Sequence, residues 1–295
     1  MKFFFGCLKL LAPTKVKPLT KERIHHKKWE DLEFQFFSVG GEETFFYLPQ
    51  KKIAFDVGRG YPFLSGAKSI FLSHCHADHV GGLVFLGRTL ALQKKRKTKV
   101  FLPKESQKEM ERILKIWEKV EGKNFPLTFI PWEAGEKLEL GKRAKIQAFS
   151  TYHSIPSLGY FIYHKVEKLK EEYQRLSFAQ IAKLKEEGVS LTYEKEIPFL
   201  AYTGDTSVKV LDSHPELYQA KYLILECTFI DEKHRDLAFK QGHIHLDDIV
   251  ERANYFQNEQ ILLFHFSPRY SPKEIQFQIS SKLPATLWER VFPCL

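Results

Sequence analysis

The sequence predicts an α/β fold whose polar functional residues gather at one edge of a sheet. Three apolar, strand-like runs at 198–205, 221–226 and 261–265 each end in a polar residue, and a fourth run at 69–72 leads into a histidine-rich stretch. Because buried strands deliver their last residues to one sheet edge, we expect a shared site there. With 295 residues, 43% of them hydrophobic, the chain can bury a sizeable core in one large domain or two.

The N-terminal part of the chain is expected to lead into this sheet. Residues 12–31 are polar and basic and contain two prolines, which is typical of a linker or an extended lead-in. Short strand-like runs follow at 33–37, 44–48 and 52–56, and they form a meander that leads to the histidine-rich stretch.

A helix is predicted over residues 104–121 from the spacing of its apolar residues. That apolar stripe is expected to face the core and consists of Met110, Ile113, Leu114, Trp117 and Val120. Further strand-like runs at 127–130 and 144–149 lead to His153, which follows the end of a strand.

Residues 163–197 differ in character from their surroundings and are interpreted as an insertion. Two charged segments, 165–176 and 177–188, are predicted to be helices, the second with a serine cap and a glycine stop. We therefore expect an N-terminal extension over residues 1–31 and a main domain over residues 32–295 that contains the insertion.

The bulk charge favours a polyanionic partner. A formal net charge of +9 and a sequence pI of about 9.1 suit nucleic acid through phosphate neutralisation, although a basic but indifferent surface explains the charge equally well. The densest basic cluster is a predicted loop that either contacts RNA phosphates or is simply solvated. Its candidate substrate-binding residues are Lys94, Lys95, Arg96 and Lys97.

Cysteine usage indicates a reducing compartment. The four cysteines have no Cys-x-x-Cys spacing and do not suggest a disulfide framework in a chain of this size, so we expect a cytoplasmic protein. Residues 1–11 are apolar but interrupted by Lys9 and lack a cleavage site, so they are interpreted as a strand or an anchoring arm. No apolar run approaches the ~18 to 20 residues of a membrane-spanning helix.

Four candidate metal ligands lie close together at a predicted strand-to-helix turn. They are His74, His76, Asp78 and His79 in the stretch Leu72-Ser-His-Cys-His-Ala-Asp-His-Val-Gly-Gly82. Side chains alternate in an extended segment, so His74 and His76 point to one side, Cys75 faces away, and the turn brings the other two to a second ion. Imidazole with carboxylate suits zinc, less specifically manganese or iron, in an open catalytic site. The alternative is a loop with ordinary surface histidines.

This motif resembles that of the metallo-β-lactamase fold, and further motifs narrow the resemblance to the tRNase Z phosphodiesterases, in particular their plant-type short form. These further motifs occur in the family's order at residues 54–59, 202–206, 225–231, 242–245 and 263–270. The resemblance implies a four-layer αβ/βα sandwich of two mixed sheets, and a homodimer. It gives the insertion at 163–197 two alternative roles, a substrate-gripping arm or a helical hairpin that covers the core or a subunit interface.

The resemblance also implies two zinc ions per chain, with manganese as an alternative metal. The ligand sets are His74, His76 and His153 for one ion, Asp78, His79 and His265 for the other, and Asp205 as a bridge. Two such ions would lower the pKa of a shared water from 15.7 to about 7, and that water would attack phosphorus in line.

Three residues are assigned catalytic roles beside the ions. Asp78 orients or deprotonates the water, and the residue that matches the family's acid is His243, whose imidazole Glu226 orients. His245 is the main competitor for the role of acid. If His243 is not the acid, it is a helix cap or a surface histidine.

The implied reaction is cleavage of precursor tRNA after the discriminator base, with recognition of tRNA shape. Residues 38–44 stand where many tRNase Z enzymes carry a Pro-x-Lys-x-Arg-Asn loop, so cleavage position and CCA discrimination stay open. Arg269 and Tyr270 either hold phosphate or close the sheet edge. Two other interpretations compete: a phosphodiesterase or nuclease of this fold that acts on another RNA or a small diester, and a metal-free RNA-binding scaffold, against which the intact ligand positions argue.

Overall fold

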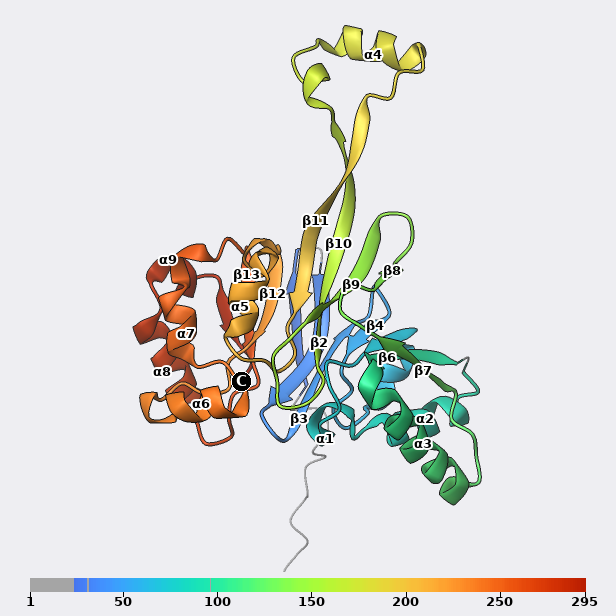
Figure 1. The fold of residues 1–295 in the computed structure, drawn as a ribbon, viewed down its shortest axis with the longest axis vertical. Helices are drawn as coiled ribbons and strands as arrows, with labels where there is room; N and C mark the ends of the chain where they lie inside the picture. Colours follow the sequence, from blue (N-terminus) through green and yellow to red (C-terminus); the bar gives the residue numbers. More distant parts are fainter. Residues whose placement is uncertain (1–23, 31, 96) are drawn as a thin grey trace, which may run out of the picture.

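The computed structural model describes residues 24–30, 32–95 and 97–295, and it confirms the α/β sandwich (Figure 1). Two seven-stranded sheets lie face to face. The first, in spatial order, consists of β1 (His25–Trp29), β2 (Leu32–Val39), β3 (Glu43–Leu48), β4 (Ile53–Phe55), β5 (Ser69–Phe71), β6 (Thr98–Pro103) and β7 (Leu127–Trp132). The second, in spatial order, consists of β14 (Val291–Pro293), β13 (Gln260–Phe264), β12 (Tyr222–Glu226), β11 (Thr192–Tyr202), β10 (Leu158–Leu169), β9 (Ala144–Ser150) and β8 (Lys137–Glu139).

Each sheet changes from antiparallel to parallel pairing across its width. In the first sheet β1 to β4 pair antiparallel and β4 to β7 pair parallel. In the second sheet β8 to β11 pair antiparallel and β11 to β14 pair parallel. Parallel strands point the same way, so their carboxyl ends lie at one edge of each sheet. This is the edge at which the sequence places its polar residues.

Aromatic side chains fill the space between the two sheets. Phe36 and Phe46 from the first sheet and Tyr202 and Phe264 from the second are all completely buried in one cluster. The rings of Phe46 and Phe264 meet edge to face across the sheets with their centroids 5.2 Å apart. Burying one such side chain stabilises the fold by roughly 1.5–3 kcal/mol. The phenylalanine-rich composition therefore serves this layer.

Helices cover the outer face of each sheet and complete the four layers. On the first sheet they are α1 (Ala77–Val80), α2 (Leu83–Leu92) and α3 (Gln107–Glu121). On the second sheet they are α5 (Lys209–Ser213), α7 (Leu246–Glu251), α8 (Pro272–Lys282) and α9 (Ala285–Trp288). The longest of the second group, α8, begins at a capping box formed by Ser271 and Glu274 and buries Ile275 and Ile279.

The helix predicted over residues 104–121 is present as α3, but its apolar stripe is only partly core. Met110 and Leu114 are buried, whereas Ile113, Trp117 and Val120 are 48%, 44% and 72% exposed. Within the sheet, α3 contacts mainly β7, and it also contacts the turn at Lys104–Ser106 that precedes the helix. The sheet therefore covers only one narrow side of α3. The periodicity predicted the helix correctly, but it does not report how wide a face the neighbouring layer covers.

The insertion forms a projecting two-stranded arm with a short helix at its tip, not two helices (Figure 1). The predicted helix at 165–176 is wrong because residues 165–169 continue β10 and pair with residues 192–196 of β11. Lys165 lies 3.6 Å from Glu194 and 3.0 Å from Glu139, so strand pairing places opposite charges together and overrides helix propensity. The second helix is confirmed as α4 (Phe178–Glu186), capped by Ser177 and Gln180.

The predicted lead-in at 12–31 includes a strand of the main sheet. Residues 25–29 form β1, which pairs with β2 from His25 opposite Phe36 to Trp29 opposite Leu32. The linker interpretation is therefore wrong for this part, because Trp29 is buried against Phe34 and Tyr222 and anchors the strand. The strand or anchoring arm predicted at 1–11 lies outside the described residues.

The state of the cysteines and the length of the helices can be compared with the predictions about disulfides and membrane-spanning segments. Cys75, Cys227 and Cys294 are free thiols, and Cys7 lies outside the described residues. Within the described part of the chain, every helix is too short or too polar to cross a membrane.

Candidate metal centre

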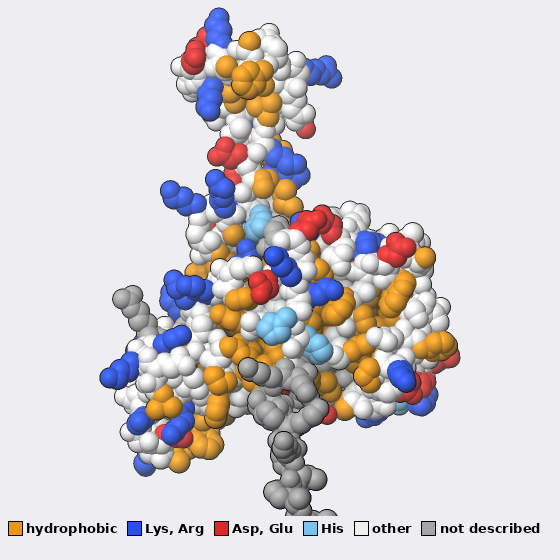
Figure 2. All heavy atoms as spheres, turned by 180° about the vertical axis from the view of Figure 1, so that it is seen from behind, with side chains coloured by type: hydrophobic (Ala, Val, Ile, Leu, Met, Phe, Trp, Pro, Cys, Tyr) orange, Lys and Arg blue, Asp and Glu red, His pale blue; other side chains and the backbone are white. Residues whose placement is uncertain are grey.

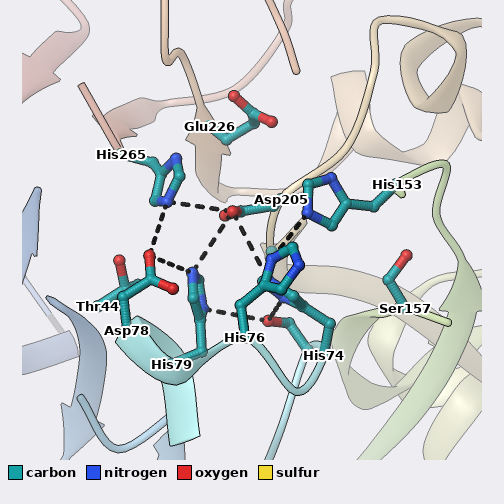
Figure 3. Close-up of polar contacts among 12 residues, drawn as sticks. Thr44, His74, His76, Asp78, His79, His153, Ser157, Asp205, Glu226 and His265 are labelled. Atoms are coloured by element: carbon teal, nitrogen blue, oxygen red, sulfur yellow. Dashed lines mark hydrogen bonds and ion pairs between the residues drawn. The ribbon is translucent and has the colours of Figure 1, made fainter. Parts of the chain in front are cut away.

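The centre lies at the carboxyl ends of strands from both sheets (Figure 3). The histidine-rich motif follows β5 and turns into α1, which begins directly after His76. Asp205 follows β11, Glu226 ends β12 and His265 follows β13, while His153 comes from the loop before β10. Four strand ends and one loop thus bring distant parts of the sequence together, as the recurring pattern of apolar run and polar end predicts.

Three imidazoles form one side of the centre. His76 Nδ1 lies 3.0 Å from His74 Nε2 and 3.3 Å from His153 Nε2. Four ligand atoms in tetrahedral arrangement at the zinc–nitrogen bond length of about 2.05 Å lie roughly 3.3 Å from one another. The two distances from His76 are therefore close to the spacing of ligand atoms around one small divalent cation, and the three nitrogens all lie within 4.8 Å of one another.

A carboxylate and two imidazoles form the other side. Asp78 Oδ2 lies 3.6 Å from His79 Nε2 and 3.5 Å from His265 Nε2. The backbone N–H of Gly41 donates a hydrogen bond of 3.0 Å to the same carboxylate oxygen. Thus the three predicted members of this group also converge on one small volume.

Asp205 lies between the two groups through one oxygen. Its Oδ2 is 3.1 Å from His265 Nε2, 3.5 Å from His79 Nε2 and 3.8 Å from His74 Nε2. The other oxygen, Oδ1, and His79 Nε2 are both buried without a hydrogen-bond partner in the described part of the chain. Buried polar atoms without partners are costly, so these orphaned atoms fit the binding of cations by this donor set.

The imidazoles on the first side are held in the form that binds metal. Burial lowers the pKa of His74 well below its ordinary value, and neighbouring imidazoles lower it further. Burial likewise lowers the pKa values of His76 and His153. Since the neutral imidazole is the ligand form, these side chains are ready to bind a divalent cation at neutral pH.

Asp56, to which no role was assigned from the sequence, holds the motif in place. Its carboxylate accepts hydrogen bonds from Ser73 N at 2.7 Å and Ser73 Oγ at 2.8 Å, and it lies 2.8 Å from His79 Nδ1. It also accepts the hydroxyl of Tyr202. Its backbone has φ 53°, a conformation that is uncommon for a residue other than glycine. The missed signal is that Asp56 ends an apolar run, as Asp205 does.

Glu226, which is completely buried, and the partly buried His243 form a pair beside the centre. Glu226 Oε1 lies 2.8 Å from His243 Nδ1, and the carboxylate also accepts the backbone N–H of Thr206. Burial lowers the pKa of His243, but the charge and hydrogen bond of Glu226 outweigh burial and raise the pKa to about 9. His243 thus carries a proton at neutral pH in this environment, which suits a general acid.

His245 is committed to structure. Its Nε2 lies 3.0 Å from the carbonyl oxygen of Asp231, and its Nδ1 accepts the backbone N–H of Asp247 at the start of α7. The side chain is completely buried. Of the two candidate acids, His243 is therefore the one whose Nε2, near the centre, has no hydrogen-bond partner among the described residues.

Thr228, which was not predicted from the sequence, connects the proposed acid to the candidate ligands. Its Oγ1 lies 2.7 Å from Glu226 Oε2, 3.1 Å from His243 Nδ1 and 2.9 Å from His265 Nδ1. A single threonine carries no recognisable pattern in one sequence, because its role depends on which three side chains surround its hydroxyl.

The predicted substrate-binding lysines lie away from the centre. They precede β6, whereas the metal motif follows β5, and these two strands are parallel. Lys94, Lys95 and Lys97 therefore lie at the opposite sheet edge, where Lys95 and Lys97 border a hollow with Lys52, Lys68 and other residues. Arg96 lies outside the described residues. This basic cluster is therefore remote from the candidate metal centre.

The last two predicted contacts differ from each other. The hydroxyl of Tyr270 is engaged with His234 Nδ1, which ties the chain after His265 to the neighbouring loop. Arg269 is exposed, with its guanidinium 5.7 Å from the centre of the Phe229 ring. The contact of Tyr270 favours closure of the sheet edge, whereas the guanidinium of Arg269 is exposed to solvent.

The segment at 38–44 lies against the centre. Ser38 Oγ accepts the backbone N–H of His265, and Gly40 N donates to the carbonyl oxygen of Phe266. A Cβ at Gly40 would lie 2.9 Å from the backbone oxygen of His265, so this approach requires glycine. The residues that replace the Pro-x-Lys-x-Arg-Asn loop therefore support the strand end that carries His265.

Comparison with known proteins agrees with this geometry. Residues 59–266 match the model of the β-lactamase superfamily domain. The chain is 36% identical to tRNase Z TRZ1 of Arabidopsis thaliana over 89% of this chain and 95% of the relative, and 35% identical to the chloroplastic tRNase Z TRZ2 of the same plant over 90% and 75%. Both the family and the His/Asp groups indicate a divalent metal.

Solved structures share the fold at low sequence identity. The metallo-β-lactamase fold protein YhfI of Bacillus subtilis superposes with a TM-score of 0.60 at 14% identity, over 87% of this chain and 92% of that one. Human tRNase Z, short form, superposes with a TM-score of 0.50 at 18% identity, over 81% and 87%. From the matched domain and the extent of its identity to plant relatives, the chain belongs to the tRNase Z family of the metallo-β-lactamase superfamily.

Proposed function

We propose that this chain is an endoribonuclease that removes the 3′ trailer from precursor tRNA by hydrolysis of one phosphodiester bond. The observation that carries the proposal is the pair of ligand groups that share Asp205 Oδ2 beside the His243–Glu226 pair. Relatives named tRNase Z and ribonuclease Z support the substrate.

The proposed cofactor is a pair of zinc ions, with manganese as the alternative. His74, His76 and His153 would hold one ion, Asp78, His79 and His265 would hold the other, and Asp205 would contact both. When bound, such ions lower the pKa of a water molecule and withdraw charge from the phosphate oxygens. Neutral imidazoles and carboxylates without any thiolate are the donors that an open hydrolytic site uses.

The protein's own residues would position the water and move the protons. Asp78 faces the second group with one carboxylate oxygen, so its other oxygen can orient the attacking water and accept its proton. His243 would donate a proton to the departing 3′-oxygen of the tRNA. Glu226 holds the ring through Nδ1 and leaves Nε2 to face the substrate. The tRNA would leave with a 3′-hydroxyl and the trailer with a 5′-phosphate.

The arm formed by β10, α4 and β11 is proposed to contact the RNA body. It projects away from the sheets, and α4 buries no residue, so the arm does not cover the core of its own chain (Figure 1). Lysine and arginine side chains are spread over the arm and the adjoining body (Figure 2). With β10 running from Leu158 to Leu169, the arm tip lies roughly 35 Å or more from the centre. Contact with the arm therefore requires a large substrate.

We further propose that the protein is a homodimer that acts in the cytoplasm. The exposed apolar residues of α3, among them Trp117 and Val120, suit burial against a second copy.

The free thiols among the described cysteines suit a reducing compartment, which supports the cytoplasmic location. The main domain is proposed to start at β1, so that the extension ends near residue 24. Light scattering on the purified chain tests the dimer.

The test of function is cleavage of a 3′-extended precursor tRNA with zinc or manganese present, with the new ends mapped. A single cut beside the discriminator base, lost in His243→Ala, is the expected result. If only a small diester is hydrolysed, the protein is a phosphodiesterase of the same fold with another substrate. If the purified protein binds no metal and cuts neither, the scaffold interpretation replaces both.

A further inference from the structure

A groove of about 520 Å³ begins at the metal centre and runs along its His153 side. One wall is the loop at 151–154, which carries His153. A second wall is formed by Ser207 and the start of α5, and a third by the end of α6 (Arg235–Gln241) with Gly242. The groove therefore adjoins the candidate ligand His153 and Gly242, the residue before His243, yet none of the roles assigned above uses it.

The walls are fixed to each other at Gly242. This residue ends α6 with φ 72°, and its carbonyl oxygen lies 3.1 Å from His153 Nδ1. A Cβ at Gly242 would lie only 3.3 Å from the Cα of His153. The end of α6 therefore packs directly on the loop that carries His153. This contact fixes the position of the end of α6 relative to the metal centre.

The groove presents an aromatic ring together with cations. Phe239 of α6 borders it and is 82% exposed, which leaves most of an apolar ring in water. Lys240 and Lys209 also border it, and neither has a carboxylate within ion-pair distance in the described ranges. Lys209 Nζ lies 4.3 Å above the ring of Tyr152, which holds this lysine at the wall. The acid of the groove, Asp212, is neutralised by Arg252 at 2.9 Å.

An aromatic face flanked by cations is the combination that binds single-stranded nucleic acid. Every base can stack on an aromatic ring, and the cations neutralise the adjoining phosphates. An apolar partner would not use the lysines, and a double helix does not offer a free base face. The groove therefore suits one unpaired nucleotide.

The position of the acid decides which nucleotide this is. His243 follows Gly242 directly, and its ring centre lies 5.0 Å from that of His153, which borders the groove. In the proposed reaction His243 protonates the 3′-oxygen that departs, and that oxygen belongs to the nucleotide on the 5′ side of the cut. The groove opens beside this leaving group.

We propose that the groove binds the unpaired nucleotide on the 5′ side of the cut, with its base stacked on Phe239 and its phosphate near Lys240 and Lys209. This inference rests on the proposed function, because it needs an RNA whose base pairing ends one nucleotide before the cut. It makes Phe239 a substrate-binding residue outside the motifs that carry the family resemblance.

The test compares two substrates with two variants. The substrates are a 3′-extended precursor tRNA and the same RNA with an abasic nucleotide on the 5′ side of the cut. The variants are Phe239→Leu, which keeps an apolar side chain but removes the stacking face, and Phe277→Leu, a matched control on α8, where Phe277 is 67% exposed. The measured quantity is kcat/KM, with bound zinc and thermal unfolding as checks on the fold.

The expected result is a roughly tenfold loss of kcat/KM for Phe239→Leu on the normal substrate and no further loss on the abasic one. Phe277→Leu should match the wild type on both. Equal losses on the two substrates, or a normal rate for Phe239→Leu, would overturn the stacking assignment. With a third RNA that is abasic on the 3′ side of the cut, disappearance of the Phe239→Leu effect would overturn the choice of nucleotide. If the wild type does not cut the precursor at all, the proposed function is wrong, and the stacking proposal that rests on it is wrong as well.

Discussion

The metal centre and the arm are built in opposite ways. At the centre, His74, His79 and Asp205 are almost completely buried, and hydrogen bonds to Asp56 and to Thr228 hold His79 and His265 in place. In the arm, α4 buries no residue, and the ribbon beneath it is mostly exposed. Chemistry needs ligand atoms held within a fraction of an ångström, whereas contact with a large RNA needs only reach and charge. Substitutions in the two regions should therefore separate chemistry from recognition.

The largest effect should come from Asp205→Ala. This change removes the one oxygen that faces both ligand groups, so bound metal should fall and kcat should drop on the order of 10³-fold on both precursor tRNA and a small diester. Metal analysis and steady-state kinetics measure this. Asp212→Ala, which removes an exposed carboxylate paired with Arg252, is the matched control and should keep its metal. Full metal content in Asp205→Ala would contradict the bridging assignment.

His243→Ala should lower kcat on precursor tRNA by roughly 10²- to 10³-fold while bound metal stays unchanged. The reason is that the variant lacks the donor for the departing 3′-oxygen. A diester whose leaving group is a stable phenolate needs no such proton and should be affected far less. His26→Ala, an exposed histidine on β1, serves as the control. Equal losses on both substrates would mean that His243 supports the metals and is not the acid.

Shortening the arm should affect RNA alone. Replacing residues 168–193 with Asn-Gly closes the ribbon across the Glu167–Glu194 pair with a two-residue turn. We expect KM for precursor tRNA to rise roughly 10- to 100-fold because cationic contacts are lost, and the effect should shrink as salt is raised. Hydrolysis of a small diester should continue at the wild-type rate. An unchanged KM for tRNA would remove the arm from recognition.

Glu226→Gln should shift the alkaline limb of the pH profile. The acid works when protonated, so the rate falls as pH rises through the pKa of His243. Burial lowers that pKa, and the charge of Glu226 raises it to about 9, so removing the charge leaves burial dominant. The loss of rate should therefore begin roughly 1 to 3 pH units lower in the variant. A profile that coincides with the wild type would rule out His243 as the titrating acid.

The smallest effect compares two matched helix caps. Ser271→Ala removes the cap of α8, which packs Ile275 and Ile279 on the sheet, and should lower the free energy of unfolding by about 1 kcal/mol. Ser177→Ala removes the same kind of cap from α4, which buries no residue completely, and should leave global unfolding unchanged. Urea unfolding measures both. Equal destabilisation would show that the arm folds as one unit with the sheets.

Local patterns were sufficient for much of the fold and of the centre. The α/β class, the helices α3 and α4 and the edge at which polar residues gather were all predicted correctly. The ligand motif can be recognised from the sequence because its residues lie within one turn of the chain. The strand ends can be recognised because each is an apolar run followed by one polar residue. The cap at Ser177 is likewise a contact between residues close in sequence, so it can be predicted from a single sequence.

Other features depend on contacts between residues far apart in the chain. Residues 165–169 favour a helix by composition, yet they form a strand because β11 offers hydrogen bonds and opposite charges. The choice between His243 and His245 depends on Glu226 and Asp231, which lie outside the local pattern. The covered width of α3 and the distance of Lys94 from the centre likewise follow from sheet packing.

The sequence alone therefore determined which residue types stand at the strand ends, and thereby the chemistry that this protein can offer. The tertiary structure decided which of those residues meet, as with Thr228, Asp56 and the groove at Phe239. The physical reason is that propensity and spacing act over a few residues, whereas burial, strand pairing and hydrogen-bond geometry are set by partners that only the folded chain brings together.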